Sequence, residues 1–400
     1  MPRGGSVRLG AVDGDLTLEP KARVEADGRI VVSGDVRCRG DAQFVGSLEC
    51  HALRADDGET TVTGDLVVHA ELEARDSTID VQGGLTAKSV DVDRRLKVHG
   101  AARAEEFEVG GSLEGEATLD AERVAVGGRF KLAGKLTARK VETGGWLDVG
   151  EVDLDSLEVG GSAEVKGGTI RSSIEVGGRF RSTAPLVFGA LEVGGLAELA
   201  AGSKGRGVEV GGKFSSEGDL TFERLEVGGI GTIGGNGAGE GVEVGGKFEV
   251  RGALRLRGKA EVGGAIAVGD ALEGAELEVG GKLEARRAVF TGTADVGGSV
   301  TTREGLRAQH IRLERRSRAI GPLVGGEVDI GSRARVEDVY GESIRLGDRS
   351  EARRVVGGTV RLGDQVTADE VVYSGTAELG HDVRVKSPPR KVDRLDPFPL

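Results

Sequence analysis

Apolar and polar residues alternate in short triplets through most of the chain. In residues 242–258 the triplets are Val-Glu-Val, Phe-Glu-Val and Leu-Arg-Leu, and they begin 6 residues apart. A period of two predicts β-strands with the apolar side chains on one face and the charged side chains on the other. Such triplets are too short to be arms of a hairpin. We therefore expect the chain to turn a corner after each triplet, so that three corners close one coil.

The same frame recurs at a nearly constant spacing, which is the signature of a repeat protein. Outside the block where a glycine doublet follows the first triplet, the triplets continue towards both ends. We therefore predict an all-β fold, a single-stranded, triangular (three-faced) parallel β-helix of about 17 residues per coil. The doublets are spaced 16 to 18 residues apart, and their first glycines are Gly110, Gly127, Gly144, Gly160, Gly177, Gly194, Gly211, Gly228, Gly245, Gly263, Gly280 and Gly297.

The triplets predict one continuous β-solenoid over residues 7–386 and a proline-containing C-terminal tail over residues 387–400. Solenoid repeats contact only their neighbours, so one core can run through a long chain. About 22 coils stacked about 4.8 Å apart would give a rod on the order of 100 Å long. For the tail we keep two alternatives, a disordered arm and a plug in which Leu395, Phe398 and Leu400 fold over the final coil.

The inward positions show a second period, of two coils. Large residues in one coil alternate with small residues in the next, so that a Phe ring can extend into the space that its neighbour leaves. We expect Phe180, Phe214 and Phe248 to be core residues in the second strand, alternating with Ala163, Ala197 and Gly231. In the third strand the same rule sets Leu186, Leu220 and Leu254 against Thr169, Ser203 and Gly237.

The glycine doublets are expected to supply a positive φ at a sharp corner. A phosphate-binding loop would need a helix after the glycines, and here another strand follows each doublet. Cys38 and Cys50 fall at inward positions and are expected in the core. Hexapeptide acyltransferases are the nearest enzymatic alternative, but they keep a stricter six-residue frame and add a helix or a catalytic loop. We expect no enzyme, no catalytic residue, no cofactor and no metal site.

The outward position of the first strand is acidic in nearly every coil that carries a doublet. Stacked carboxylates about 4.8 Å apart repel one another. Cations just past the corner, at Arg129, Arg179, Lys213, Lys247 and Lys282, are expected to lean over them. The series is either a solvated face screened by counterions or a docking strip for a basic partner or for divalent cations. We call it the acidic ladder: Glu108, Glu142, Glu158, Glu175, Glu192, Glu209, Glu226, Glu243, Glu261, Glu278 and Asp295, with Ala125 as the interruption.

The formal charge of -12 argues against a nucleic-acid-binding protein, which needs a basic face. We expect the charge to keep a long solenoid soluble. The sequence shows no apolar stretch of signal-peptide length near residue 1 and no run as long as a membrane span. The expected location is cytoplasmic.

These repeats resemble those of the bactofilins, the polymer-forming cytoskeletal proteins. The resemblance covers roughly residues 7–386 and rests on the repeated LEVGG and VEVGGKF segments, on VSGDV and TVTGDL near the start, and on the short proline-containing tail. It implies a right-handed β-helix, in agreement with the usual hand of parallel crossovers. It also implies end-to-end assembly into filaments without nucleotide, and scaffolding of other proteins, often at a membrane. A typical member has a shorter core with disordered tails and a membrane-targeting segment before it, and this sequence departs from both features.

The first triplet, at Val7, follows only six residues, so we expect the strand edges of the first coil to be open. The predicted polymerisation interface comprises Val7, Leu9, Leu16 and Leu18. The predicted partner is a second copy of the chain, with protein clients in addition and membrane association left open. The alternative function is a monomeric β-helical spacer or binding platform that uses the acidic ladder.

Overall fold

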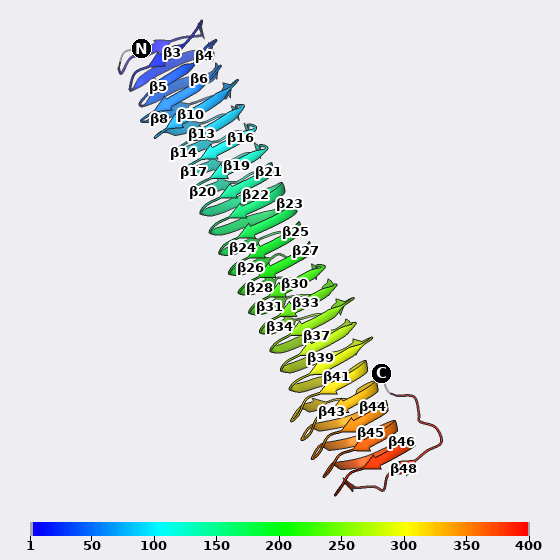
Figure 1. The fold of residues 1–400 in the computed structure, drawn as a ribbon. Coiled ribbons are helices and arrows are strands. Elements are labelled where there is room, and N and C mark those ends of the chain that lie inside the picture. The colour runs from blue at the N-terminus through cyan, green and yellow to red at the C-terminus, as the bar shows by residue number, and fades with distance from the viewer. Residues whose placement is uncertain (1–2, 399–400) are drawn as a thin grey trace. The chain divides into compact units, whose positions relative to one another are not determined.

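The computed structural model describes residues 3–398 of the chain. These residues form a parallel β-solenoid of about 23 turns, spaced about 17 residues apart, and contain no helix. The prediction of an all-β parallel solenoid with this repeat is therefore confirmed. The chain divides into two compact units, residues 1–200 and 201–400. Within each unit the strands that occupy the same place in successive turns stack in parallel (Figure 1).

The first unit contains these strands: β1 (Ser6–Arg8), β2 (Ala11–Val12), β3 (Leu16–Leu18), β4 (Ala22–Val32), β5 (Val36–Arg39), β6 (Ala42–Cys50), β7 (Leu53–Asp56), β8 (Glu59–Val62), β9 (Leu66–Val68), β10 (Glu71–Arg75), β11 (Thr78–Val81), β12 (Leu85–Thr86), β13 (Ser89–Val92), β14 (Arg95–Val98), β15 (Ala102–Arg103), β16 (Glu106–Val109), β17 (Ser112–Gly115), β18 (Leu119–Asp120), β19 (Arg123–Val126), β20 (Arg129–Leu132), β21 (Leu136–Thr143), β22 (Trp146–Val159), β23 (Ser162–Val176), β24 (Arg179–Ser182), β25 (Leu186–Val193) and β26 (Leu196–Leu199).

The second unit contains these strands: β27 (Ser203–Val210), β28 (Lys213–Ser216), β29 (Leu220–Thr221), β30 (Arg224–Val227), β31 (Ile230–Ile233), β32 (Gly237–Gly239), β33 (Gly241–Val244), β34 (Lys247–Val250), β35 (Leu254–Leu256), β36 (Lys259–Val262), β37 (Ala265–Gly274), β38 (Glu276–Val279), β39 (Lys282–Phe290), β40 (Thr293–Val296), β41 (Ser299–Leu313), β42 (Arg318–Ile320), β43 (Leu323–Ile330), β44 (Arg335–Leu346), β45 (Glu351–Leu362), β46 (Thr367–Leu379), β47 (Arg384–Val385) and β48 (Arg390–Lys391).

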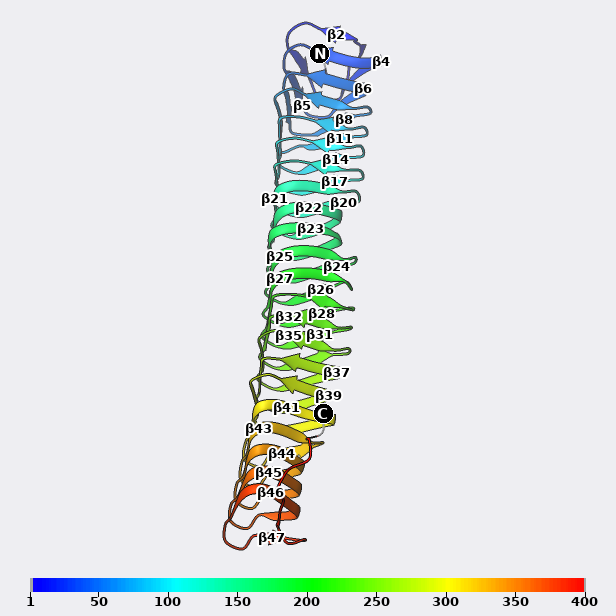
Figure 2. The same cartoon turned by 90° about the vertical axis from the view of Figure 1, so that its right-hand side faces the viewer.

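Each strand pairs in parallel with the strand at the same place in the next turn. In the first unit Val90 of β13 faces Phe107 of β16. In the second unit Leu225 of β30 faces Val242 of β33. All four side chains are buried, so the core of each unit is built from columns of inward residues, one residue per turn. In the view of Figure 2 the stacked strands β11, β14 and β17 belong to such a column of the first unit.

Large and small core residues alternate in the second strand. Ala163 faces Phe180 in the first unit, and Phe214 faces Gly231 in the second. Phe180, Phe214 and Phe248 are all fully buried. A Cβ atom placed on Gly231 would lie 2.8 Å from Cδ2 of Phe248, so the ring occupies the space that the glycine leaves.

One member of the predicted third-strand alternation is wrong by one residue. Leu186 faces Gly168, whereas Thr169 faces Val187 and is only half-buried. The register shifts after Ile170, and Gly167 and Gly168 have φ values of 155° and 120°. This irregularity adds a residue to the turn, which the triplet count from the sequence does not detect.

The doublet glycines do not have the positive φ that the sequence analysis expected. None of the twelve doublets contains a glycine with φ in the left-handed region. Instead, the corners of successive turns stack so closely that a side chain has no room. A Cβ on Gly127 would lie 2.2 Å from the carbonyl oxygen of Gly110, and a Cβ on Gly128 would lie 2.5 Å from that of Gly111. Close approach of the backbone is therefore the reason for glycine at this corner.

Left-handed backbone occurs at the same corner in the turns that lack a doublet, except in the turn with Asp93 and Arg94. There the corner is longer, and most of the residues with positive φ are not glycine. Asp57 and Asp76 in the first unit have φ of 56° and 47°. In the second unit the corresponding residues are Arg316, Arg333, Arg349, Gln365 and Asp382, with φ from 55° to 63°.

Candidate interaction surfaces

The outward residues of the first strand form a column of carboxylates within each unit, which only Ala125 interrupts, in the first unit. In the first unit Glu158 faces Glu175, which faces Glu192. In the second unit the column runs in register from Glu209 to Asp295. The register therefore places the members of the acidic ladder that lie in one unit directly above one another. Paired strands lie about 4.8 Å apart, so the carboxylates of neighbouring turns repel.

Cations two residues earlier in the same strand compensate part of this charge. In the first unit the Nζ atom of Lys140 lies 2.6 Å from Oε1 of Glu142, and Nη2 of Arg123 lies 2.8 Å from its Oε2. Hydrogen bonds from Lys140 and then Arg123 hold the pKa of Glu142 below its ordinary value. Because the two cations are exposed and Glu142 is half-exposed, each ion pair contributes little to the free energy of folding.

The second unit uses the same arrangement. Nζ of Lys259 lies 2.7 Å from a carboxylate oxygen of Glu261 and 2.7 Å from one of Glu278. These two hydrogen bonds raise the pKa of Lys259. Nε of Arg224 lies 3.3 Å from Oε1 of Glu226.

Three of the five cations just past the glycine corner have partners outside the ladder, so the expectation is wrong for Arg129, Lys247 and Lys282. Lys247 pairs with Glu249, 3.0 Å away, and Lys282 pairs with Glu284. Each lysine lies on the same strand as its partner, β34 or β39, which is the strand that follows the corner and not the strand that carries the ladder. The guanidinium carbon of Arg129 lies 5.3 Å from the centre of the Trp146 ring.

Several ladder carboxylates have no ion pair among residues 3–398. Glu175, Glu192, Glu209 and Glu243 are exposed and belong to this group. The residues two positions before them are Ser173, Ala190, Gly207 and Gly241, which carry no charge. The compensating column is thus interrupted where these four carboxylates stand.

A groove follows the ladder where Ala125 interrupts it. Its volume is about 480 Å³, and its floor is the glycine corner at residues 110, 127, 144 and 160. Its acidic lining comprises Asp91, Asp93, Glu108, Glu142 and Glu158. Burial, followed by repulsion from Glu108 and Asp93, raises the pKa of Asp91. The pKa values of Asp91 and Glu142 are therefore shifted in opposite directions within one groove.

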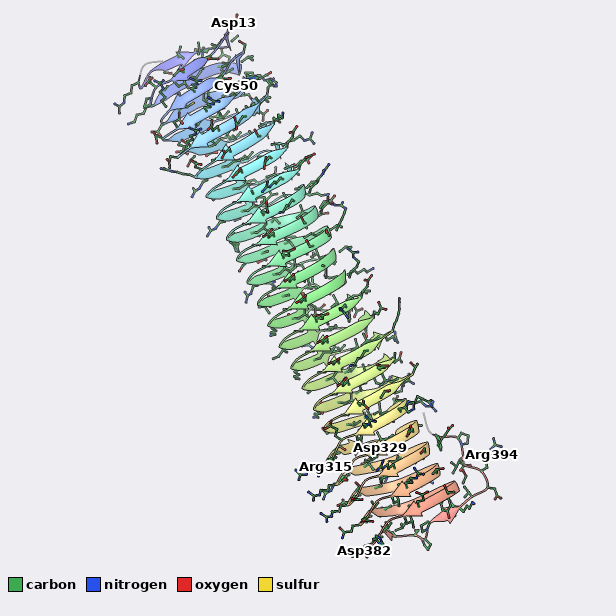
Figure 3. All side chains as sticks on the ribbon, viewed as in Figure 1. Asp13, Cys50, Arg315, Asp329, Asp382 and Arg394 are labelled. Atoms are coloured by element: carbon green, nitrogen blue, oxygen red, sulfur yellow. The ribbon has the colours of Figure 1, made fainter. Side chains whose placement is uncertain are left out.

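A second surface, not anticipated from the sequence, lies at the longer corners of the second unit. We call it the arginine corner: Arg312, Arg315, Arg316, Arg333, Arg345 and Arg349. All six side chains are exposed, and none forms an ion pair with the described part of the chain. Figure 3 labels Arg315 at this edge of the second unit, with Asp329 nearby. In the sequence three carboxylates, Glu314, Asp329 and Asp348, are interspersed with these arginines. Asp329 stands in register between Arg312 and Arg345.

The first described turn has strands that are paired on one side. Strands β1 and β2 pair with β4, and β3 pairs with β5; the described residues supply no strand for their other edges. Of the predicted interface residues, Val7 and Leu9 are half-exposed. Leu16 and Leu18 are buried, at 8% and 0% exposure. Val7 and Leu9 are therefore the members of the set that remain accessible.

The last turns of the second unit also leave apolar core positions partly exposed. Strands β47 and β48 pair with β46, and no described strand follows them. The inward-column residue Leu379 is 47% exposed. Val383 and Val385 are half-exposed.

The tail runs back along the side of the second unit. This differs from both alternatives expected from the sequence, the disordered arm and the plug over the final coil. The amide of Val392 donates a hydrogen bond to the carbonyl of Tyr373, and the ring of Phe398 lies 6.0 Å from the ring of Tyr340. Figure 1 shows this segment passing beside β44. Leu400 lies outside the described residues. We call residues 392–398 the strap.

The strap lies over an apolar strip that faces outward. In the third strand the outward column reads Arg255, Glu273, Val289 and Arg307 before it becomes apolar. The apolar strip comprises Val324, Tyr340, Val356 and Val372. Its three valines are 2%, 8% and 5% exposed although they point away from the core. The sequence signal is the paired apolar residues Leu323-Val324, Val355-Val356 and Val371-Val372, which break the alternation.

The described part of the chain holds no group of three or more His, Cys, Asp or Glu side chains arranged to bind a metal ion. Cys38 and Cys50 are free and buried, and burial raises the pKa of each thiol to about 12. Residues 3–398 include no helix long and apolar enough to cross a membrane.

Comparisons with known proteins give no relative from which a role could be transferred. No family model matches the chain, and no match was found among curated proteins or among solved structures.

Proposed function

We propose that the chain is a non-enzymatic structural protein, a bactofilin-like solenoid that assembles end to end into nucleotide-independent filaments and scaffolds other components. In this proposal the coil is triangular and right-handed. The motif resemblance suggests both features, and right-handed crossovers are the rule for parallel strands.

The observation that carries the proposal is that no strand of the described residues pairs with the outer edge of β1, β2 and β3. A row of free backbone N–H and C=O groups is a template for another strand, and globular proteins usually block such edges with a helix, a bulge or charged residues. Val7 and Leu9 stand half-exposed at this edge. A second copy that adds its own first turn would pair these groups and cover these side chains.

Joining about a two-fold axis is the simplest geometry, because one patch then serves both copies. A filament needs a second joint. The half-exposed Val383 and Val385 and the exposed Leu379 at the last turns of the second unit provide an apolar surface for it. Filaments built from these two joints would have no polarity.

Negative-stain electron microscopy of the purified chain, in buffer without nucleotide or divalent cations, tests the proposal. We expect unbranched filaments, and we expect ATP and GTP to leave them unchanged. Single particles of the size of one chain would contradict the filament proposal and favour the alternative, a monomeric spacer or binding platform.

A further inference from the structure

One line of side chains in the second unit changes its charge along the stack of turns. The outward column of the first strand is acidic from Glu209 to Asp295, and then continues as Arg312, Asp329 and Arg345. The corner beside this column is Gly-Gly in the acidic turns, whereas it carries Arg315, Arg316, Arg333 and Arg349 in the turns that follow. An acidic half and a basic half therefore lie on the same edge of one unit.

The two halves are available for binding. In the acidic half Glu209 and Glu243 are exposed and have no ion pair in the described residues, and Lys259 is shared by Glu261 and Glu278. In the basic half the six guanidiniums of the arginine corner are exposed and free of ion pairs within residues 3–398. Each half thus carries an excess of one sign that the unit does not neutralise itself.

We propose that two copies of the chain pair side by side in antiparallel orientation, with the acidic half of each second unit against the arginine corner of the other. A strip that is acidic in one half and basic in the other is complementary to itself about a two-fold axis. Both halves repeat once per turn, so their charges have the same spacing of about 4.8 Å. Every turn in contact can then contribute, and guanidiniums can bind carboxylates through two parallel hydrogen bonds.

The self-complementary strip favours a second copy over other partners. A polyanion would satisfy the arginine corner, and a basic peptide would satisfy the acidic half, but each would leave the opposite half unmatched. This lateral pairing is separate from the two end-to-end joints, which use the first turn of the first unit and the last turns of the second unit.

The test removes both end-to-end joints first. In a chain with Val7→Lys and Leu9→Lys at the first joint and Val383→Lys and Val385→Lys at the second, sedimentation velocity should show a dimer at about 0.1 M salt and a monomer at about 1 M salt, where the Debye length falls from about 10 Å to about 3 Å. A monomer in both buffers, or a dimer that persists at 1 M salt, would overturn the proposal. Neither end-to-end joint is intact in this background, so the two proposals fail independently.

Two charge-swap variants in the same background make the test specific. One carries Glu209→Lys with Glu243→Lys, and the other carries Arg315→Glu with Arg345→Glu; all four side chains are exposed, and none has positive φ. Each variant alone should be monomeric at 0.1 M salt, and an equimolar mixture should recover the dimer. If either variant alone dimerises as the parent does, or the mixture stays monomeric with both variants folded by circular dichroism, the proposal is wrong.

Arg315→Gln with Arg345→Gln replaces the second variant if that variant does not fold. This neutral variant should weaken the dimer at least tenfold, and an unchanged dimer would overturn the proposal.

Discussion

The carbonyl oxygen of Gly228 lies 2.4 Å from the position that a Cβ atom would take on Gly245, one turn later in the second unit. The relationship repeats one turn further on, where a Cβ on Gly263 would lie 2.5 Å from the carbonyl oxygen of Gly245. Backbone atoms cannot move aside as a flexible side chain can. The doublet therefore sets how closely the corners of neighbouring turns stack.

Gly245→Ala should destabilise the protein by about 1 to 3 kcal/mol, the usual cost of overpacking. Gly241 is a matched control in the same unit, because the nearest atom to its Cβ position is the carbonyl oxygen of Lys259 at 3.6 Å. Gly241→Ala should be neutral, or stabilise by about 0.4 to 1 kcal/mol through the unfolded state. Thermal and urea unfolding of the two variants measure the difference. Equal effects would show that the corner can relax.

This corner shows how far the sequence alone could lead. The period of the doublets placed the corners correctly, because strand length and corner length repeat together. The reason for glycine could not be predicted, since it depends on the carbonyl of another turn and not on the local φ. For the same reason the left-handed corners at Arg316, Arg333 and Arg349 were not foreseen in residues that rarely adopt positive φ.

The second-strand column predicts a strong dependence on the size of its residues. Phe214→Ala should destabilise by about 3 to 5 kcal/mol, because the ring is fully buried and the small residues beside it cannot fill the cavity. Gly231→Ala should also destabilise, because the added Cβ meets the ring of Phe248. Combining Gly231→Ala with Phe248→Leu should cost less than the sum of the single changes, which a double-mutant cycle from unfolding curves would show. Strict additivity would argue against a shared space.

Asp91 and Glu142, which line the same groove, predict opposite effects of neutralising one carboxylate. The folded state raises the pKa of Asp91, so its charged form costs free energy at pH 7, and the cost disappears as the pH falls through the folded pKa. The pKa of Glu142 is lowered, so its contribution stabilises above the ordinary pKa and is lost as the pH falls through the folded pKa.

Asp91→Asn should therefore raise the melting temperature at pH 7, and Glu142→Gln should lower it slightly. Both differences from the parent should shrink at about pH 3, below the ordinary carboxyl pKa values of about 4. Melting curves at the two pH values, recorded at low salt, provide the test. Shifts of the same sign at pH 7 would mean that the ladder behaves as a uniformly screened face.

The strap should protect the apolar strip on the side of the second unit. Deletion of residues 392–400 would expose Val324, Val356 and Val372, so we expect increased binding of an apolar fluorescent dye and a lower melting temperature. Phe398→Ala should have a smaller effect in the same direction. Arg394→Ala is the control, since Arg394 is an exposed strap residue and should change neither quantity. Unchanged dye binding after the deletion would show that the strap does not cover the strip.

The surfaces were less predictable than the core. The acidic ladder followed from the period of two, because an outward position in one turn is outward in the next. The cations that pair with the ladder could not be predicted in this way. Lys140 and Lys259 lie two residues before the ladder residue of their own strand, and not after the corner. The contact between the strap and the apolar strip could not be predicted, because the sequence does not show where residues 392–398 return along the unit. The only signal was the pair Val355-Val356 and its equivalents, which break the alternation.

Sedimentation velocity of the unmodified chain at micromolar concentration tests the central claim, assembly through the first turn. At about 1 M salt, where charge-driven lateral pairing is screened, we expect polymers from the parent chain. Val7→Lys with Leu9→Lys should give a folded, much smaller particle, because a charge at each position would have to be buried in the joint. Deletion of residues 392–400 should leave the N-terminal joint intact. A parent chain that sediments as a monomer, or a double variant that polymerises as the parent does, would contradict the account.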